Sequence, residues 1–269
     1  MRNLISFAFA LIIAGPAHAT TSKPELRVCA NPNDLPFSNA QGLGFENKLA
    51  EMVAGELGET VRYTWTDERE HFIRKTLNAG KCDVLMGVPA GFDEVETTRP
   101  YYSSGYVFVS REDRALHLQS MRDPRLRKLK IGMHVIGDDN TPPMEALSRQ
   151  GITQNIVGYM IYSDAQPKGR SRLIDDVAAG KIDIAAVWGP LAGYYAQHAG
   201  KLLAVTPITD TAGFGPLVFQ YAMAMGVRKG DEALKARLND VIAHHLPEIR
   251  NLLRRYGIPL VETPARAAG

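Results

Sequence analysis

Cysteine is scarce in this chain: Cys29 and Cys82 are the only two among its 269 residues. No constellation of metal ligands accompanies them, so the sequence predicts no zinc site, and we expect neither a metal nor a cofactor. Both cysteines stand in or beside neighbouring predicted core strands. They can form a disulfide bond in an oxidising compartment or remain buried, unreactive thiols, and the sequence leaves both alternatives open.

A large excess of charge of one sign is also missing. The formal net charge is +2, and acidic and basic residues are interspersed along the chain. One basic cluster, residues 122–130, contains Asp123 and lacks aromatic residues, whereas a nucleic-acid-binding face needs a concentrated basic stripe. We therefore interpret the cluster as a solvated helix or loop and expect no nucleic-acid partner.

Long apolar runs are confined to the N-terminus. There Arg2 precedes an apolar run, residues 4–15, and residues 17–19 (Ala-His-Ala) match the small-x-small pattern of a signal peptidase site. The run is shorter than the roughly 20 residues of a membrane span, and no other run approaches that length. We predict that residues 1–19 are a cleaved signal peptide and that the mature chain is periplasmic without a membrane span; the alternative is an uncleaved anchor.

Recognisable catalytic motifs are lacking as well. The chain contains no Ser-His-Asp order, no glycine-rich nucleotide-binding loop and no HExxH motif. Glu46, Asp34 and Asp93 could supply carboxylates for acid–base chemistry, but solvation at the surface explains these side chains equally well. We predict that the protein is not an enzyme.

What the sequence does contain is a regular alternation of predicted strands and helices. Short apolar strands at residues 26–30, 61–65 and 83–88 are separated by segments with helical spacing of apolar residues, such as 45–57, which ends at Gly58. This alternation of three strands and two helices, joined by short links, predicts a parallel sheet that is covered on both faces.

One segment occurs twice in similar form. Residues 79–91 (AGKCDVLMGVPAG) and 179–193 (AGKIDIAAVWGPLAG) share Ala-Gly-Lys-x-Asp, an apolar strand and a turn rich in Gly and Pro. We interpret them as corresponding parts of two similar α/β lobes, with coincidence of common helix-stop residues as the alternative. The predicted division is 20–109 for the first part of lobe 1, 110–216 for lobe 2, and 217–269 for the return to lobe 1 and the C-terminal helices.

Further elements follow from the same patterns. Strands that cross between the lobes are expected at residues 106–109 and near 217–220. Lobe 2 is predicted to contain strands at 129–134 and 183–187, and helices after Pro142, at 172–179 and at 191–199. Two amphipathic helices, at 231–245 and 247–256, complete the chain.

Three blocks of residues carry a resemblance at the level of the fold. They are 26–46, which includes Pro36-Phe37-Ser38 and Gly44-Phe45-Glu46, then 81–87 (KCDVLMG) and 226–231 (GVRKGD). In this order they resemble the type II periplasmic solute-binding proteins of solute-binding protein family 3, over nearly the whole mature chain. The resemblance implies an α/β fold of the type II periplasmic-binding-protein kind, with two α/β lobes joined by hinge strands.

Further blocks narrow the resemblance. They are 28–39 (VCANPNDLPFSN), 76–84 (TLNAGKCDV), 98–102 (TRPYY), 136–143 (IGDDNTPP) and 187–193 (VWGPLAG). These blocks are similar to the MoxJ and XoxJ accessory proteins of bacterial methanol oxidation. The resemblance implies an accessory protein that acts beside a methanol dehydrogenase dependent on pyrroloquinoline quinone (PQQ), of the calcium or lanthanide type, with its c-type cytochrome as a further partner.

The cleft between the lobes departs from the pattern of amino-acid-binding relatives. Those relatives hold the ligand carboxylate with an arginine after the third strand, and the ammonium with an acid near a strand end of the far lobe. The corresponding stretch here, residues 91–96, has three acids and no arginine, while Arg99 directly precedes Pro100. Val187 leads into Trp188 and not into an acid. We therefore expect no tight binding of free amino acids.

An aromatic-lined cleft is the expected replacement, although aromatic residues are also common in cores. The loop 137–140 is either a cation site made of side-chain oxygens or a polar turn that caps the next helix. The candidate residues of the ligand or partner cleft are Asn33, Pro36, Phe37, Glu46, Pro89, Arg99, Tyr101, Tyr102, Asp138, Asp139, Asn140 and Trp188. Two other functions stay open: a receptor that delivers a small non-amino-acid solute to an ABC transporter, and a fold-related lyase acting on a cyclic dienyl acid.

Overall fold

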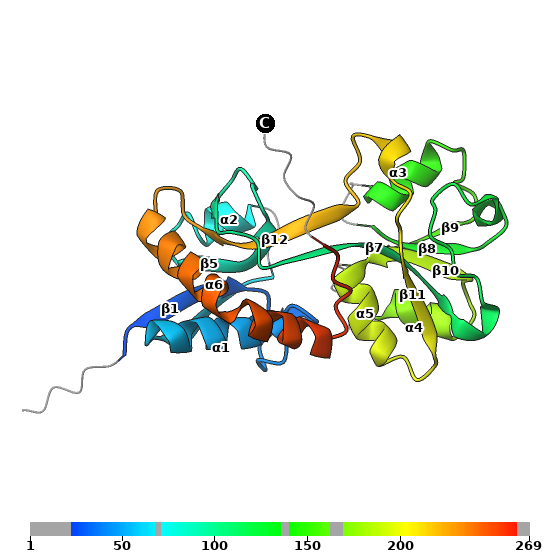
Figure 1. Ribbon diagram of the computed structural model, residues 1–269. Helices are drawn as coiled ribbons and strands as arrows, with labels where there is room; N and C mark the ends of the chain where they lie inside the picture. Colours follow the sequence, from blue (N-terminus) through cyan, green and yellow to red (C-terminus); the bar gives the residue numbers. More distant parts are fainter. Residues whose placement is uncertain (1–22, 68–70, 136–139, 162–168, 263–269) are drawn as a thin grey trace, which may run out of the picture.

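The chain folds into two α/β halves that lie side by side (Figure 1). The computed structural model describes residues 23–67, 71–135, 140–161 and 169–262. In these residues one ten-stranded sheet runs through both halves, and helices pack on its faces. The predicted signal peptide lies outside the described residues.

The first half contains the N-terminal strands and the last helix. Its elements are β1 (Glu25–Ala30), β2 (Asn33–Asp34), β3 (Ser38–Asn39), α1 (Phe45–Leu57), β4 (Thr60–Trp65), α2 (Phe72–Lys75), β5 (Val84–Pro89), β6 (Glu96–Thr97) and α6 (Glu232–Arg255). β1 pairs in parallel with both β4 and β5, while β2 and β3 form a small antiparallel pair. The parallel core of this half is the one that the strand–helix alternation predicts.

The second half repeats the parallel arrangement. Its elements are β8 (Ile131–Val135), α3 (Pro142–Ser148), β9 (Ile156–Met160), α4 (Arg172–Ala178), β10 (Ile184–Trp188), α5 (Gly189–Gln197) and β11 (Leu203–Pro207), with 3-10 turns at Glu112–Arg114, Pro124–Arg127 and Ala212–Phe214. β8 lies between β9 and β10 and is parallel to both. The sequence did not predict β9 and β11, because both are short and Tyr159 is the one buried residue in the two strands, so neither shows a clear alternation.

Two long strands, β7 (Tyr102–Arg111) and β12 (Gln220–Val227), connect the halves. They pair antiparallel with each other at the start of β7, and the rest of β7 pairs with β10 and β11. The resulting order is β4-β1-β5-β12-β7-β10-β8-β9. The predicted fold class, two α/β lobes joined by hinge strands, is confirmed. The predicted boundary after residue 109 falls inside β7, and the division into segments stays a prediction.

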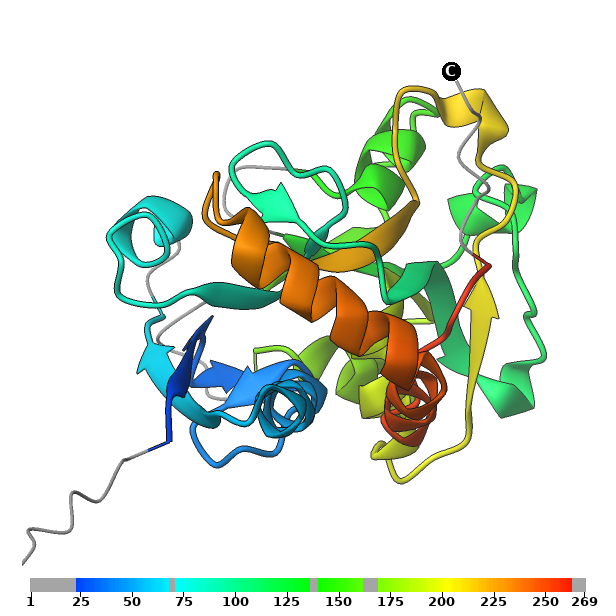
Figure 2. The same ribbon diagram turned by 60° about the vertical axis from the view of Figure 1, so that its left-hand side comes forward.

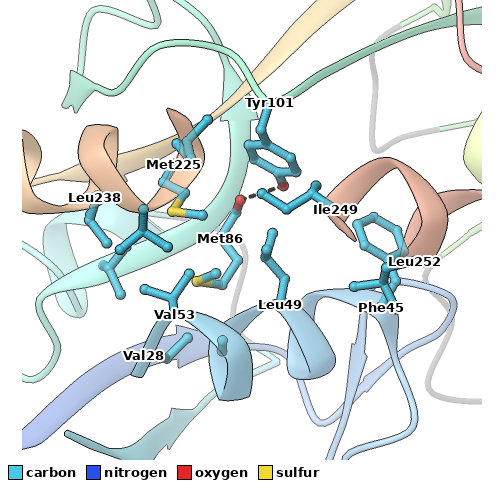
Figure 3. Close-up of a cluster of buried hydrophobic side chains, with 14 of the residues drawn as sticks. Val28, Phe45, Leu49, Val53, Met86, Tyr101, Met225, Leu238, Ile249 and Leu252 are labelled. Atoms are coloured by element: carbon cyan, nitrogen blue, oxygen red, sulfur yellow. Dashed lines mark hydrogen bonds between the residues drawn. The ribbon is translucent and has the colours of Figure 1, made fainter. Parts of the chain in front are cut away.

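Helix α1 forms where its apolar spacing predicts it. Gly58 ends the helix in a left-handed conformation (φ 72°), and the Asn47 side chain accepts a hydrogen bond from the backbone N–H of Gly44 at the start. Leu49 and Val53 are fully buried against α6 and the sheet (Figure 3). Burial of such a side chain stabilises the fold by about 1.5–3 kcal/mol.

The C-terminal helix α6 runs across the first half toward the second (Figure 2). The sequence predicts two helices here, at 231–245 and 247–256, and this prediction is confirmed, because α6 consists of two helical segments that meet at a kink at His245, whose φ is −111°. The kink lies two residues before Pro247, which lacks a backbone N–H and crowds the preceding turn. Helix α2, in the segment between β4 and β5 where helical spacing was also expected, is a single turn.

A disulfide bond joins Cys29 of β1 to Cys82, which stands just before β5, with the two Cα atoms 5.5 Å apart. Both residues are buried in a small apolar cluster with Ile73 and Leu77. Of the two alternatives that the sequence leaves open, the structure has the bond, which ties the loop before β5 to the neighbouring strand.

Candidate functional site

A cavity of about 400 Å³ lies between the two halves. Both halves and both connecting strands contribute to its wall. The lining residues are Asp34, Phe37, Glu46, Gly87, Pro89, Tyr106, His134, Thr141, Ile161, Arg170, Ala186, Val187, Trp188, Leu191, Tyr221 and Met223. Its size falls in the range of about 300–1,000 Å³ that is typical of small-molecule sites.

Aromatic rings form one part of the cavity wall. Trp188, at the end of β10, meets Tyr106 of β7 edge to face with ring centroids 5.6 Å apart, and meets Tyr221 of β12 at 5.7 Å. The three strands supply these rings because they converge where the two halves join. Burial raises the pKa of both tyrosines, so both phenols are neutral at physiological pH. This wall can stack on an apolar or aromatic group.

An ion pair crosses the cavity from one half to the other. Arg170, just before α4, contacts the carboxylate of Asp34 on β2 at 2.5 Å, and their side chains are 9% and 24% exposed. A nearby hydrogen bond also joins the halves, since the Tyr195 hydroxyl on α5 donates to the Leu35 carbonyl at 3.0 Å. The guanidinium and the carboxylate therefore neutralise each other inside the cavity.

Glu46 stands in the first turn of α1 and faces the cavity beside Gly87, where any side chain would collide with its carboxyl group. Burial, and next the negative charge of Asp34, raise the pKa of Glu46 to about 8. At pH 7 the carboxyl is mostly protonated, so it can donate a hydrogen bond as well as accept one.

His134, near the end of β8, is the second titratable group that burial keeps neutral. Burial, and next the positive charge of Arg170, lower its pKa to about 4. Its Nε2 atom and the Thr141 hydroxyl have no hydrogen-bond partner among the described residues. With Glu46 and His134 neutral, and Arg170 paired with Asp34, the cavity has no net charge near pH 7.

Four of the sequence-predicted cleft residues line this cavity: Phe37, Glu46, Pro89 and Trp188. Tyr101 and Tyr102 instead lie in the apolar core, 1% and 5% exposed, and the Tyr101 hydroxyl donates to the Met86 carbonyl at 2.6 Å (Figure 3). They lie there because the core supplies both apolar packing and an acceptor for the Tyr101 hydroxyl.

The other predicted cleft residues do not line the cavity either. Pro36 is buried, whereas Asn33, Arg99 and Asn140 are exposed. The backbone N–H of Arg99 bonds to the Asn239 side chain on α6, which holds this segment against the helix. Asp138 and Asp139 lie outside the described residues. Among those residues, no group of three or more His, Cys, Asp or Glu side chains could hold a metal ion.

The cavity contains an arginine, Arg170, that no sequence pattern indicated. Arg170 enters from the segment before α4, not from the stretch after β5 where amino-acid-binding relatives place theirs. No local signal marks Arg170, His134 or Thr141 in the sequence. Tyr106 was predicted as part of a crossover strand. It lines the cavity because β7, β10 and β12 converge there in the folded protein.

Residues 26–257 match the family model of the bacterial extracellular solute-binding proteins, family 3. The chain is a family 3 solute-binding protein. Within the family it is 34% identical to protein MoxJ of Paracoccus denitrificans over 266 residues, which cover 94% of this chain and 95% of MoxJ. The resemblance expected from the sequence blocks is therefore confirmed.

Solved structures of similar proteins agree with this assignment. The crystal structure of MxaJ from Methlophaga aminisulfidivorans MPT matches this family 3 protein with a TM-score of 0.77 and 27% identity, covering 88% of this chain and all of MxaJ. The periplasmic binding protein XoxJ from Methylobacterium extorquens AM1 matches with a TM-score of 0.73 and 34% identity, at the same coverage. Within the described ranges, no helix of the solute-binding protein is long and apolar enough to cross a membrane.

Proposed function

We propose that this protein is a periplasmic accessory protein of a PQQ-dependent methanol dehydrogenase system, and that it binds the dehydrogenase during maturation or activation. The observation that carries the proposal is the similarity to MoxJ, MxaJ and XoxJ over nearly the full length of each protein. The c-type cytochrome of the system is a further partner in this proposal. The buried disulfide supports an oxidising compartment such as the periplasm.

The charges of the cavity support a role other than amino-acid capture. A zwitterionic ligand needs a free cation for its carboxylate and a free anion for its ammonium. Here Arg170 and Asp34 contact each other, and Glu46 is mostly protonated near pH 7. We include Phe37, Pro89 and Trp188 in the proposed contact surface for a ligand or for a segment of the partner.

Binding without catalysis is part of the proposal. His134 has a pKa of about 4 and stays neutral at physiological pH, so it is a poor general acid there. Turnover of a cyclic dienyl acid by the purified protein, abolished in the Glu46→Gln variant, would contradict this part and favour the lyase alternative.

The test is a deletion strain in which the active dehydrogenase is measured in the periplasm. We expect less dehydrogenase activity per unit of dehydrogenase protein, with reduced PQQ or metal content, and recovery when the gene is restored. Co-purification of the two proteins from periplasm is the second measurement. Unchanged activity and loading, together with no contact between the proteins, would refute the proposal.

One observation favours a second candidate function. The uncharged, aromatic cavity of about 400 Å³ suits a small neutral solute, as a receptor of an ABC transporter would bind. Native mass spectrometry of the protein purified from periplasm distinguishes the two. A bound neutral metabolite, together with loss of its uptake in the deletion strain, would support the transport receptor.

A further inference from the structure

The strand β9 forms one edge of the sheet, far from the connecting strands. In the part of the chain that the structure describes, β9 pairs with β8 alone, from Ile156 to Met160. The Asn155 carbonyl accepts a hydrogen bond from the Ile131 N–H of β8, and the Ile161 N–H donates to the Val135 carbonyl of β8. Every second residue from 155 to 161 therefore directs its backbone groups toward β8. By this alternation the N–H groups of Gly158 and Met160 point outward, away from β8.

The edge formed by β9 carries none of the usual features that prevent strand addition. Its sequence, Ile-Val-Gly-Tyr-Met, contains neither a charged residue nor proline, and Met160 is 49% exposed. The opposite edge, β4, differs because it carries the exposed Arg62, which pairs with Glu25 at 3.2 Å. Strand β9 is therefore an edge of the sheet that is open to pairing with a further strand.

A groove of about 340 Å³ runs beside this edge and is rimmed by three cations, Lys130, Arg172 and Lys181. The remaining lining residues are residues 157–160, Gly169, Asp176 and Ile182. None of them lines the cavity between the halves. The groove is a separate feature of the second half.

Among the described lining residues of the groove, Asp176 supplies the one carboxylate, and this carboxylate is already engaged. Asp176 accepts hydrogen bonds from Lys181 Nζ at 2.8 Å and from the Tyr159 hydroxyl at 2.9 Å, and Arg172 Nε lies 4.0 Å away. These contacts hold the pKa of Asp176 below its ordinary value despite burial. Lys130, Arg172 and Lys181 outnumber the one carboxylate among the described lining residues, so these residues together carry more positive than negative charge. Lys130 is the last residue of the basic cluster 122–130.

We propose that β9 and this groove form a docking surface for an extended, acidic segment of the partner protein. The segment would add to β9 as a further strand, with its backbone bonded to the outward groups of Gly158 and Met160. Its carboxylates would lie against Lys130, Arg172 and Lys181. The identity of the partner rests on the proposed function, in which the segment belongs to the dehydrogenase.

The experiment measures binding of the mature chain to purified methanol dehydrogenase from the same periplasm by biolayer interferometry. Lys130→Glu reverses a charge of the groove, and Met160→Pro removes an outward N–H that β8 does not use. We expect each change to weaken binding by about tenfold or more, and the affinity of the wild-type chain to fall with added salt. Lys201→Glu, a charge reversal outside the groove, and Met160→Leu, which keeps the N–H, should bind as the wild type does.

Hydrogen exchange provides a readout that does not depend on the variants. The amides of Gly158 and Met160 should exchange rapidly in the free protein and slowly in the complex. If the wild-type chain binds the dehydrogenase but Lys130→Glu binds equally well and these amides stay unprotected, the docking surface is refuted and the proposed function stands. If the wild-type chain does not bind, the proposed function fails and the docking surface fails with it.

Discussion

Two opposing effects determine the protonation state of Glu46. Its place in the first turn of α1 favours a carboxylate, because the helix dipole stabilises a negative charge there by about 0.3–1 kcal/mol. Burial and the charge of Asp34 act in the other direction and raise the pKa to about 8. Each pKa unit corresponds to about 1.4 kcal/mol, so burial and repulsion outweigh the dipole.

The first prediction concerns Glu46→Gln and pH. Between its ordinary pKa of 4.5 and about 8, the folded protein retains a proton on Glu46 that the unfolded chain releases. The contribution of this group to the free energy of unfolding is therefore largest below pH 4.5 and is lost as the pH rises through 8. Relative to the wild type, Glu46→Gln should gain on the order of 1–3 kcal/mol between pH 5 and pH 9.

Urea denaturation at several pH values measures this difference. Glu51→Gln is the matched control, because Glu51 lies on the exposed face of the same helix. A difference between Glu46→Gln and the wild type that does not change with pH would show that the Glu46 carboxyl is ionised in the folded protein.

At the scale of elements, the structure is held together by contacts between segments far apart in the sequence. Gly193 of α5 packs so closely on the turn after α6 that an added Cβ would collide with the Gly257 carbonyl oxygen. The rings of Tyr194 and Tyr256 stack beside this contact with centroids 6.0 Å apart. These contacts pack α5 of the second half against the end of α6, a helix of the first half.

Gly193→Ala should therefore destabilise the protein. The added methyl group has no room, and overpacking of this kind costs about 1–3 kcal/mol. The matched control is Gly55→Ala in α1, where an added Cβ meets nothing within 4 Å. That change should stabilise the protein by about 0.5–1 kcal/mol, because alanine favours the helix. Thermal denaturation of both variants is the measurement, and a stable Gly193→Ala protein would contradict the tight contact.

The disulfide between β1 and the start of β5 leads to a third prediction. The bond closes a loop between residues separated by 53 positions, which by chain entropy stabilises the fold by about 4 kcal/mol. The variant with both Cys29→Ala and Cys82→Ala should lose about 2–4 kcal/mol in urea denaturation. A reducing agent should destabilise the wild type and leave this variant unchanged. Equal stability of the two proteins in oxidising buffer would contradict the prediction.

At the scale of the whole molecule, the two halves contact each other directly across the cavity. The Arg170–Asp34 pair and the hydrogen bond from the Tyr195 hydroxyl to the Leu35 carbonyl join them. Interactions of the protein's own side chains therefore hold the two halves against each other.

Asp34→Asn should open the molecule. The change leaves the buried Arg170 without this carboxylate, and breaking a buried ion pair in this way costs about 3–5 kcal/mol. Small-angle X-ray scattering should show a larger radius of gyration, and calorimetry a lower midpoint of unfolding. Replacing both partners, with Asp34→Leu and Arg170→Met, should recover part of the stability.

The control for this prediction is Arg62→Met. Arg62 pairs with Glu25 on the surface, with side chains 67% and 46% exposed, and such pairs contribute about 0–1 kcal/mol. Its radius of gyration should equal that of the wild type. If Asp34→Asn also scatters as the wild type does, the ion pair does not hold the halves together.

Local patterns predicted the elements of this protein well. The apolar spacing in 45–57 and the glycine that follows correctly placed α1 and its end, because a helix is stabilised by residues three and four positions apart. Pro247 likewise marked the kink in α6. The strands β9 and β11 escaped prediction, since half-buried edge positions carry little periodic signal.

The candidate site was only partly predictable, because a pattern indicates that a residue is buried but not what covers it. Tyr101 and Phe37 are both aromatic residues in matching blocks, yet one lies in the core and the other lines the cavity. The two copies of the repeated turn also differ in what surrounds them. Gly91 has open space around it, whereas its counterpart Gly193 contacts the turn after α6.

The sequence by itself determined the alternation of strands and helices, the family and the low net charge. These depend on neighbouring residues or on composition. Only the tertiary structure decided that Cys29 bonds to Cys82, that Arg170 meets Asp34 and that Glu46 holds its proton near pH 7. The physical reason is that electrostatics and packing act through space, and these residues, distant in the sequence, approach each other only in the folded chain.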